Sequence, residues 1–132
     1  MSAIAGYQRT IEAAFAAIKV GDVQAMLTHY THDVVFDIPY ASPPKLITGK
    51  DNVHTYLSAA FSVFRFELTI TAAYEIATPT TAIFEYTGEG HIVATGRPYT
   101  NSYVGIYEFR DGFICRVREY FNPVQAQIAL GT

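Results

Sequence analysis

The spacing of the apolar residues changes partway along this chain, from a helical period to a strand period. Apolar side chains recur three or four residues apart between Ile4 and Ile18, which predicts a helix over residues 4–19. The same spacing between Val53 and Phe64 predicts another helix, preceded by a capping signal in the Thr-Gly-Lys-Asp sequence before it. The first half of the chain is therefore expected to be largely helical.

Between these two helices the sequence predicts a short helix and a short strand. Gly21 ends the first helix, and Asp22 suits the N-cap of a second helix that reaches about Tyr30. The segment Val34–Ile38 is expected to form a strand that ends at a proline. The pair Pro43-Pro44 predicts a loop after it.

After Phe64 the apolar residues alternate with polar ones, which is the period of strands. The expected strands span residues 65–75, 81–92, 98–110 and 113–121. Helices followed by a run of strands predict an α+β fold in which the helices pack on one face of an antiparallel sheet. At 132 residues, the chain is expected to form one domain, residues 1–132.

Composition narrows the classes of partner. Half of the residues are hydrophobic and the formal net charge is −3, which argues against a nucleic-acid partner. The 10 tyrosines and nine phenylalanines suit the wall of a small-molecule pocket. Cys115 is the only cysteine and no apolar run is long enough to span a membrane, so we expect a cytoplasmic protein. No dinucleotide or phosphate-binding glycine motif is present, and we expect no cofactor.

The last expected strand places one acid among apolar neighbours. One face carries Phe113, Cys115, Val117, Glu119 and Phe121, and the other carries Ile114, Arg116, Arg118 and Tyr120. Burial in an apolar setting raises the pKa of a carboxyl above its ordinary value of ~4.3, which suits a general acid or base. The alternative is a structural carboxylate held by a tyrosine, a backbone amide or an arginine. We favour a functional role for Glu119.

The turn before this strand decides which residues Glu119 faces. A two-residue loop at Asp111-Gly112 would set the aromatic row of the preceding strand beside the arginines. A three-residue loop with Gly112 as a bulge gathers the aromatic row with the face of Glu119, and we prefer that register. The row consists of Tyr103, Gly105, Tyr107 and Phe109.

Other polar residues have simpler interpretations. Ile38 is expected to point inward and Asp37 outward. Glu89 and His91 share a strand face that is expected to be solvated, although nearby glycines could redirect either side chain. The group His29, His32 and Asp33 could in principle bind a metal, but its position at a helix end favours capping or exposure, and we expect no metal site.

Several segments in this order and spacing resemble one family of proteins. They are Ala17–Asp22, Tyr30–Pro39, Thr48-Gly49, Tyr86–Gly90, Phe109–Gly112 and Arg118–Pro123. The chain resembles the SnoaL-like branch of the nuclear-transport-factor-2-like superfamily. The resemblance implies a cone, in which a curved sheet wraps around N-terminal helices and encloses an apolar pocket, usually in a homodimer. Members include ketosteroid isomerases, polyketide cyclases and phenazine-biosynthesis proteins.

Transfer by position discriminates among these members. The catalytic groups of the ketosteroid isomerases align with Ala14, Ile38 and Gly105, so their machinery is missing here. The acid of the cyclases aligns with Asn122. The phenazine-type proteins keep a catalytic glutamate at the position of Glu119, while their pocket histidine aligns near Glu89. The resemblance therefore implies that Glu119 is the reactive carboxyl.

These observations predict a cofactor-independent acid–base enzyme that acts on a small apolar cyclic or carbonyl compound. Glu119 would move a proton, and Tyr103, Tyr107 or Tyr30 would donate a hydrogen bond to a developing oxyanion. The pocket wall is expected to include Tyr30, Ile38, Leu57, Phe61, Val117 and Phe121. The alternatives are a non-catalytic ligand-binding or dimerisation module, and an interaction domain with a filled core.

Overall fold

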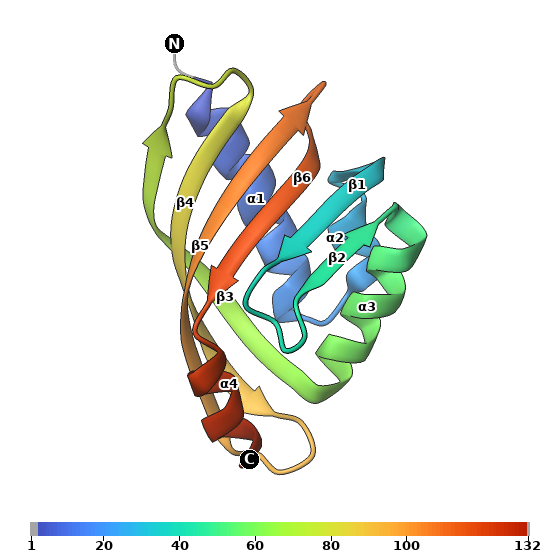
Figure 1. Ribbon diagram of the computed structural model, residues 1–132, viewed down its shortest axis with the longest axis vertical. Coiled ribbons are helices and arrows are strands. Elements are labelled where there is room, and N and C mark those ends of the chain that lie inside the picture. The colour runs from blue at the N-terminus through green and yellow to red at the C-terminus, as the bar shows by residue number, and fades with distance from the viewer. Residues whose placement is uncertain (1–2, 132) are drawn as a thin grey trace.

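The computed structural model describes residues 3–131, and its strands form one curved sheet with helices on its concave side (Figure 1). In chain order the elements are α1 (Ile4–Lys19), α2 (Val23–Leu27), β1 (Tyr30–Ile38), β2 (Lys45–Thr48), α3 (Lys50–Val63), β3 (Phe64–Glu75), β4 (Thr81–Ile92), β5 (Pro98–Arg110), β6 (Phe113–Phe121) and α4 (Pro123–Leu130). Helix α1 lies across the sheet, and α4 lies near the narrow end (Figure 1). The α+β cone is confirmed.

The strand order is β2-β1-β6-β5-β4-β3. All neighbouring pairs are antiparallel except β1 and β6, which run parallel. The expectation of an antiparallel sheet is therefore wrong at this one pair. Strands β1 and β6 are far apart in sequence, so no hairpin turn constrains their relative direction.

Most expected elements appear with the expected bounds, and the differences lie around β1 and at the C-terminus. The second helix ends at Leu27 because Tyr30 already belongs to β1, where it pairs with Ile114 of β6. The short strand β2 occupies part of the segment expected to be a loop and pairs with β1. Helix α4 was not expected, although its sequence carries the usual signals. Asn122 caps its N-terminus, Pro123 opens the helix and Gly131 ends it in the left-handed conformation.

The β5–β6 hairpin has a different turn from the expected one. Asp111 and Gly112 both have positive φ, 54° and 82°, and form a two-residue turn that pairs Arg110 with Phe113. The bulge lies at Cys115 instead of Gly112, and this reverses the first residues of β6. Ile114 is fully buried, while Phe113 is 48% exposed.

Beyond this bulge the preferred register holds. Tyr107 pairs with Val117, Gly105 with Glu119 and Tyr103 with Phe121. Glu119 therefore lies on the concave face, as predicted, although the bulge that sets its register is three residues further along the chain.

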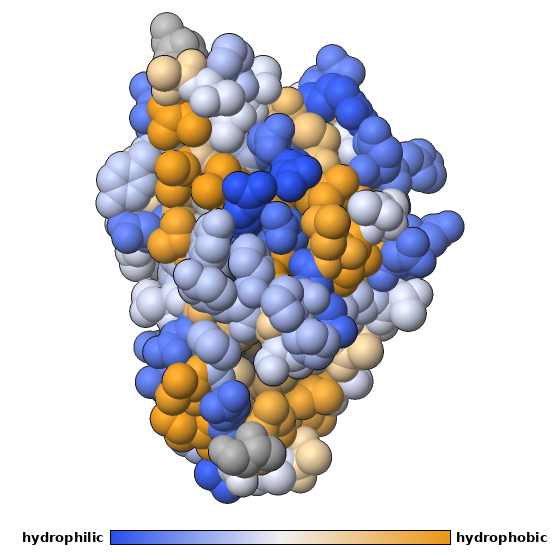
Figure 2. Space-filling view, in the orientation of Figure 1, coloured by the Kyte–Doolittle hydropathy of each residue, from blue (hydrophilic) through white to orange (hydrophobic). Residues whose placement is uncertain are grey.

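The convex face of the sheet carries a group of ion pairs. The Arg118 Nε donates to Asp37 Oδ2 at 3.0 Å, and Arg116 lies 3.6 Å from both Asp37 and Glu108. Asp37 thus points outward and Ile38 inward, as expected. Figure 2 shows a hydrophilic region over the middle of this face with apolar patches beside it.

Candidate active site

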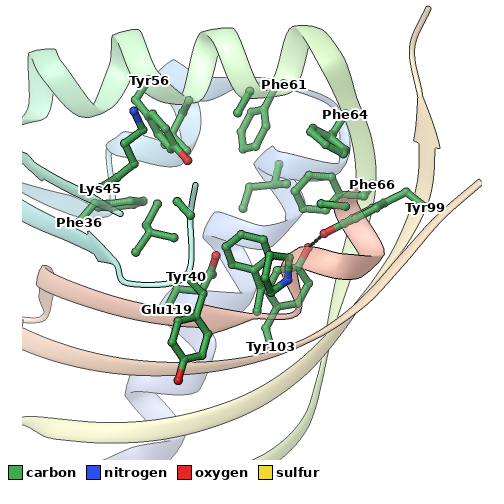
Figure 3. Close-up of a pocket in the computed structure, with 18 of the residues that line it drawn as sticks. Phe36, Tyr40, Lys45, Tyr56, Phe61, Phe64, Phe66, Tyr99, Tyr103 and Glu119 are labelled. Atoms are coloured by element: carbon green, nitrogen blue, oxygen red, sulfur yellow. Dashed lines mark hydrogen bonds between the residues drawn. The ribbon is translucent and has the colours of Figure 1, made fainter. Parts of the chain in front are cut away.

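A cavity of about 380 Å³ lies between the concave face of the sheet, α3, α4 and the segment after β1 (Figure 3). Its wall consists of Ile18, Met26, Phe36, Ile38, Tyr40, Ala41, Ser42, Lys45, Tyr56, Leu57, Ala60, Phe61, Phe64, Phe66, Leu68, Tyr99, Tyr103, Glu119, Phe121, Pro123, Ala126, Gln127 and Leu130. This volume and this mainly apolar lining are typical of sites for small organic molecules. Among residues 3–131, the wall contains one acid, Glu119, and one cation, Lys45.

The carboxyl of Glu119 lies at the centre of a set of tyrosines. Its Oε2 accepts a hydrogen bond from the hydroxyl of Tyr86, which is in turn 3.2 Å from the hydroxyl of Tyr107. Burial raises the pKa of Glu119, and the hydrogen bond from Tyr86 opposes part of this rise. The raised pKa brings a proton donor and acceptor closer to neutral pH inside an apolar cavity.

Gly105 makes room for this arrangement. It pairs with Glu119 across the β5–β6 ladder. A Cβ at this position would lie 2.5 Å from Cε1 of Tyr107 and 2.8 Å from the hydroxyl of Tyr86. The lack of a side chain at Gly105 therefore allows the Tyr86 hydroxyl to reach Glu119.

A second polar group in the wall is the hydroxyl pair of Tyr99 and Tyr103, whose oxygens are 2.5 Å apart. Asn101 orients this pair. Its Oδ1 accepts from the backbone N–H of Ser102 and Asn122, so its Nδ2 faces Tyr99 and donates to that hydroxyl at 3.0 Å. The two tyrosines share one proton in their mutual hydrogen bond, which leaves the second available to an acceptor in the cavity.

Six of the nine sequence-predicted site residues lie in the cavity wall. They are Glu119, Tyr103, Ile38, Leu57, Phe61 and Phe121. Their placement brings the predicted acid, one predicted tyrosine donor and the apolar residues of β1, α3 and β6 to one cavity.

Tyr30, Tyr107 and Val117 lie behind the wall, so the prediction that they line the cavity is wrong. All three are buried in the core. Helix α1 packs on the concave face through Tyr7 against Phe109 and Phe15 against Tyr86, and only Ile18, near its C-terminal end, lines the cavity. Burial raises the pKa of Tyr30, and the nearby charge of Glu119 raises it further.

Many residues of the site were not anticipated, including Tyr99 of the hydroxyl pair. Tyr86 lies on the β4 face opposite Glu85 and Glu89, and its parity with buried Phe84 was the signal for its inward direction. Lys45 comes from the unexpected strand β2, and Leu130 from the unexpected helix α4. Tyr56 lies on α3 one residue before Leu57, so its place in the wall required only a wider helical face.

The remaining polar candidates lie away from the cavity. Glu89 and His91 are exposed on β4, as expected. Asp33 accepts a hydrogen bond from Arg110, and this bond lowers its pKa to about 2. Within residues 3–131, no three histidine, cysteine or acidic side chains are grouped as a metal site would require.

Comparison with known proteins places the chain in a family. A Bacillus subtilis relative, the uncharacterized protein YesE, is 34% identical over 113 residues, which cover 83% of this chain and 77% of that protein. The uncharacterized PhzA/B-like protein PA3332 of Pseudomonas aeruginosa is 26% identical and covers 84% of this chain and 80% of its own.

Solved structures agree. The crystal structure named "Putative Isomerase from Bacillus subtilis" superposes with a TM-score of 0.91 at 30% identity, covering 99% of this chain and 96% of that one. Two structures of the same fold, each 18% identical, contain small molecules: trimethylamine in a Catenulispora acidiphila protein (TM-score 0.78, 92% of each chain) and polyporic acid in TerC (TM-score 0.77, 96% and 99%). The model of the SnoaL-like domain matches residues 11–117, and the chain belongs to the SnoaL-like domain family.

Proposed function

We propose that this protein is a cofactor-independent acid–base enzyme that acts on a small, mainly apolar carbonyl compound. The observation that carries the proposal is a single carboxyl, Glu119, in the wall of an apolar cavity with its pKa raised by burial. A carboxyl in such an environment can take a proton from carbon or give one to oxygen near neutral pH.

The tyrosine hydroxyls have separate roles in this proposal. The hydroxyl pair of Tyr99 and Tyr103 offers its free proton to the carbonyl oxygen of the substrate and stabilises negative charge as it develops there. Tyr86 holds one oxygen of Glu119, which leaves the other for the substrate. Tyr107 acts through Tyr86 and does not touch the substrate. Together these groups support enolisation, which is the shared first step of isomerisation, dehydration and condensation.

The apolar wall strengthens these interactions. Phe36, Phe61, Phe66 and Phe121 line the same cavity as Glu119, and these rings limit the water that it can hold. In a medium of low dielectric constant, a hydrogen bond to a developing oxyanion is stronger than the same bond in water.

The test measures hydrogen–deuterium exchange at carbon, which reports enolisation without knowledge of the product. Cyclic ketones and hydroxyketones are incubated with the protein in deuterated water, and loss of the α-proton signal is followed by NMR. We expect Glu119→Gln to lower the exchange rate by ~10²–10⁴, as loss of general acid–base catalysis does. Glu89→Gln, which changes an exposed acid on β4, is the matched control.

The alternative is a non-catalytic binding module. The apolar residues at Ile38 and Gly105, where related isomerases are expected to carry acids, favour it. If ketones bind to the wild-type protein and Glu119→Gln alike, and neither accelerates exchange, this alternative replaces the enzyme.

We also propose that residues 1–132 act as one domain and associate as a homodimer through the convex face of the sheet. Partly exposed Val104, Ile106 and Tyr120 lie there beside the ion pairs of Asp37, and such mixed surfaces are typical of interfaces. Sedimentation velocity at micromolar concentration tests the dimer, and a strict monomer would contradict it. No helix within residues 3–131 is long and apolar enough to cross a membrane.

A further inference from the structure

Among the described residues of the cavity wall, the one cation, Lys45, lies apart from the one acid, Glu119. Figure 3 shows Lys45 and Tyr56 projecting into one side of the cavity, Tyr99 and Tyr103 on the other side, and Glu119 between them. These three polar positions are separate from one another along a mainly apolar wall. A ligand that uses all three carries more than one polar group.

The direction of Lys45 follows from the sheet register. Lys45 pairs with Ile38 across the β1–β2 ladder, and paired residues share a face. Ile38 is buried in the cavity wall, so the Lys45 side chain also projects to the cavity side. Lys45 is half-buried, which suits a lysine whose apolar stem lies along the wall while its ammonium group reaches toward water.

Within residues 3–131, no acidic side chain forms an ion pair with the ammonium group. Lys19 pairs with Glu67, and the arginines of β6 pair with Asp37, but no ion pair among residues 3–131 includes Lys45. In particular, Lys45 makes no ion pair with Glu119. A cation in this position can be neutralised by a negative charge on the ligand.

Resting on the proposed function, we propose that the natural substrate bears a carboxylate, which Lys45 binds at the cavity mouth with the Tyr56 hydroxyl beside it. The substrate is then an apolar keto acid, with its carbonyl directed to Tyr103. A carboxylate fits better than a phosphate, because one lysine supplies a single positive charge, whereas phosphate sites combine a lysine or arginine with several backbone N–H groups. The described wall has no arginine, and Pro123 opens α4 without an N–H group.

The competing explanation is that Lys45 only prevents the edge of the sheet from pairing with another chain. Strand β2 is an edge strand, and a charged side chain on an edge discourages pairing with another chain. In that case Lys45 would not discriminate between ligands by their charge.

The test compares two probes of similar size by isothermal titration calorimetry. The first is 2-naphthoate, which carries a carboxylate, and the second is 2-acetylnaphthalene, a neutral ketone. We expect Lys45→Met to weaken the binding of 2-naphthoate roughly tenfold, as loss of one charged hydrogen bond does, and to leave the ketone unchanged. Lys45→Arg keeps the charge and should keep most of the affinity for the carboxylate.

Lys50→Met is the matched control, because Lys50 begins α3 outside the described wall of this cavity. The inference is overturned if wild type fails to bind 2-naphthoate, or if Lys45→Met affects both probes equally or neither. Failure of the proposed function is separate: Glu119→Gln would then leave ketone exchange unchanged, whatever Lys45 does to carboxylate binding. Selectivity for carboxylate that depends on Lys45, together with exchange that depends on Glu119, supports both.

Discussion

Replacing Gly105 by alanine tests whether a missing side chain holds the site together. The new Cβ would lie 2.5 Å from Cε1 of Tyr107 and 2.8 Å from the hydroxyl of Tyr86. Both tyrosines are almost fully buried, and the ring of Tyr86 also packs at 5.0 Å, centroid to centroid, from Phe15 of α1. Neither ring can move away without displacing the core.

The expected loss of stability follows from three contributions. Overpacking of a dense core costs ~1–3 kcal/mol. Displacement of Tyr86 from Glu119 sacrifices a hydrogen bond of about 0.5–1.5 kcal/mol. Alanine recovers roughly 0.5–1 kcal/mol because it restricts the unfolded chain more than glycine does. Gly105→Ala should therefore lower the free energy of unfolding by about 0.5–4 kcal/mol.

Urea denaturation followed by circular dichroism measures this change. Gly6→Ala is the control, since its Cβ would meet nothing closer than 3.7 Å and alanine favours the helix. Adding Tyr107→Leu removes the closest contact, so the double variant should lose less stability than the sum of the single variants. A Gly105→Ala protein as stable as wild type would refute the steric argument.

Three further results are expected. Because burial raises the pKa of Glu119, ionisation of this group destabilises the folded state as pH rises through the folded pKa. Glu119→Gln should therefore be more stable than wild type at pH 8 and lose that advantage toward pH 4. A difference in urea midpoints that does not change with pH would contradict this. Tyr86→Phe removes the hydrogen bond that lowers the pKa of Glu119, so ¹³C NMR of the labelled carboxyl should show a higher pKa. An unchanged titration would show that Tyr86 does not influence the ionisation of Glu119. The same experiment should find that Asp33 titrates at about 2, and Arg110→Gln should raise the pKa of Asp33 toward its ordinary value. An unchanged pKa in Arg110→Gln would contradict the pairing of the two residues.

The strands were predictable because alternation is a local signal, while their partners were not. Strands β4, β5 and β6 have the expected bounds. The parallel pairing of β1 with β6 depends on packing between distant segments, which periodicity does not report. In the hairpin, Asp111-Gly112 is itself a strong signal for a two-residue turn, but nothing in the sequence marks the bulge at Cys115.

The sequence predicted which side chains point to the concave face, but not which of them line the cavity and which are buried in the core. Strand parity places Tyr107, Val117 and Glu119 on one concave surface, and the structure confirms that shared face. Whether a residue on that face meets the cavity or the core depends on how the helices pack over it, and Tyr107 and Val117 belong to the core that α1 helps to form. Helix α4 closes the narrow end of the cavity, so its lining residues could not be predicted once that helix was not expected.

Gly105 stands where the resemblance to ketosteroid isomerases implies an acid, and it lies next to Glu119, the acid that this chain has in its cavity wall. The resemblance implies that related isomerases carry an acid at this position, and its absence here reads in the sequence as a loss. In the structure the space is filled by the hydroxyl of Tyr86, which donates to Glu119 on the neighbouring strand. The polar group has thus moved from β5 to β4, and the carboxyl lies on β6. A single acid with a tyrosine donor can move one proton at a time, which favours one-base chemistry over a mechanism with two carboxyl groups.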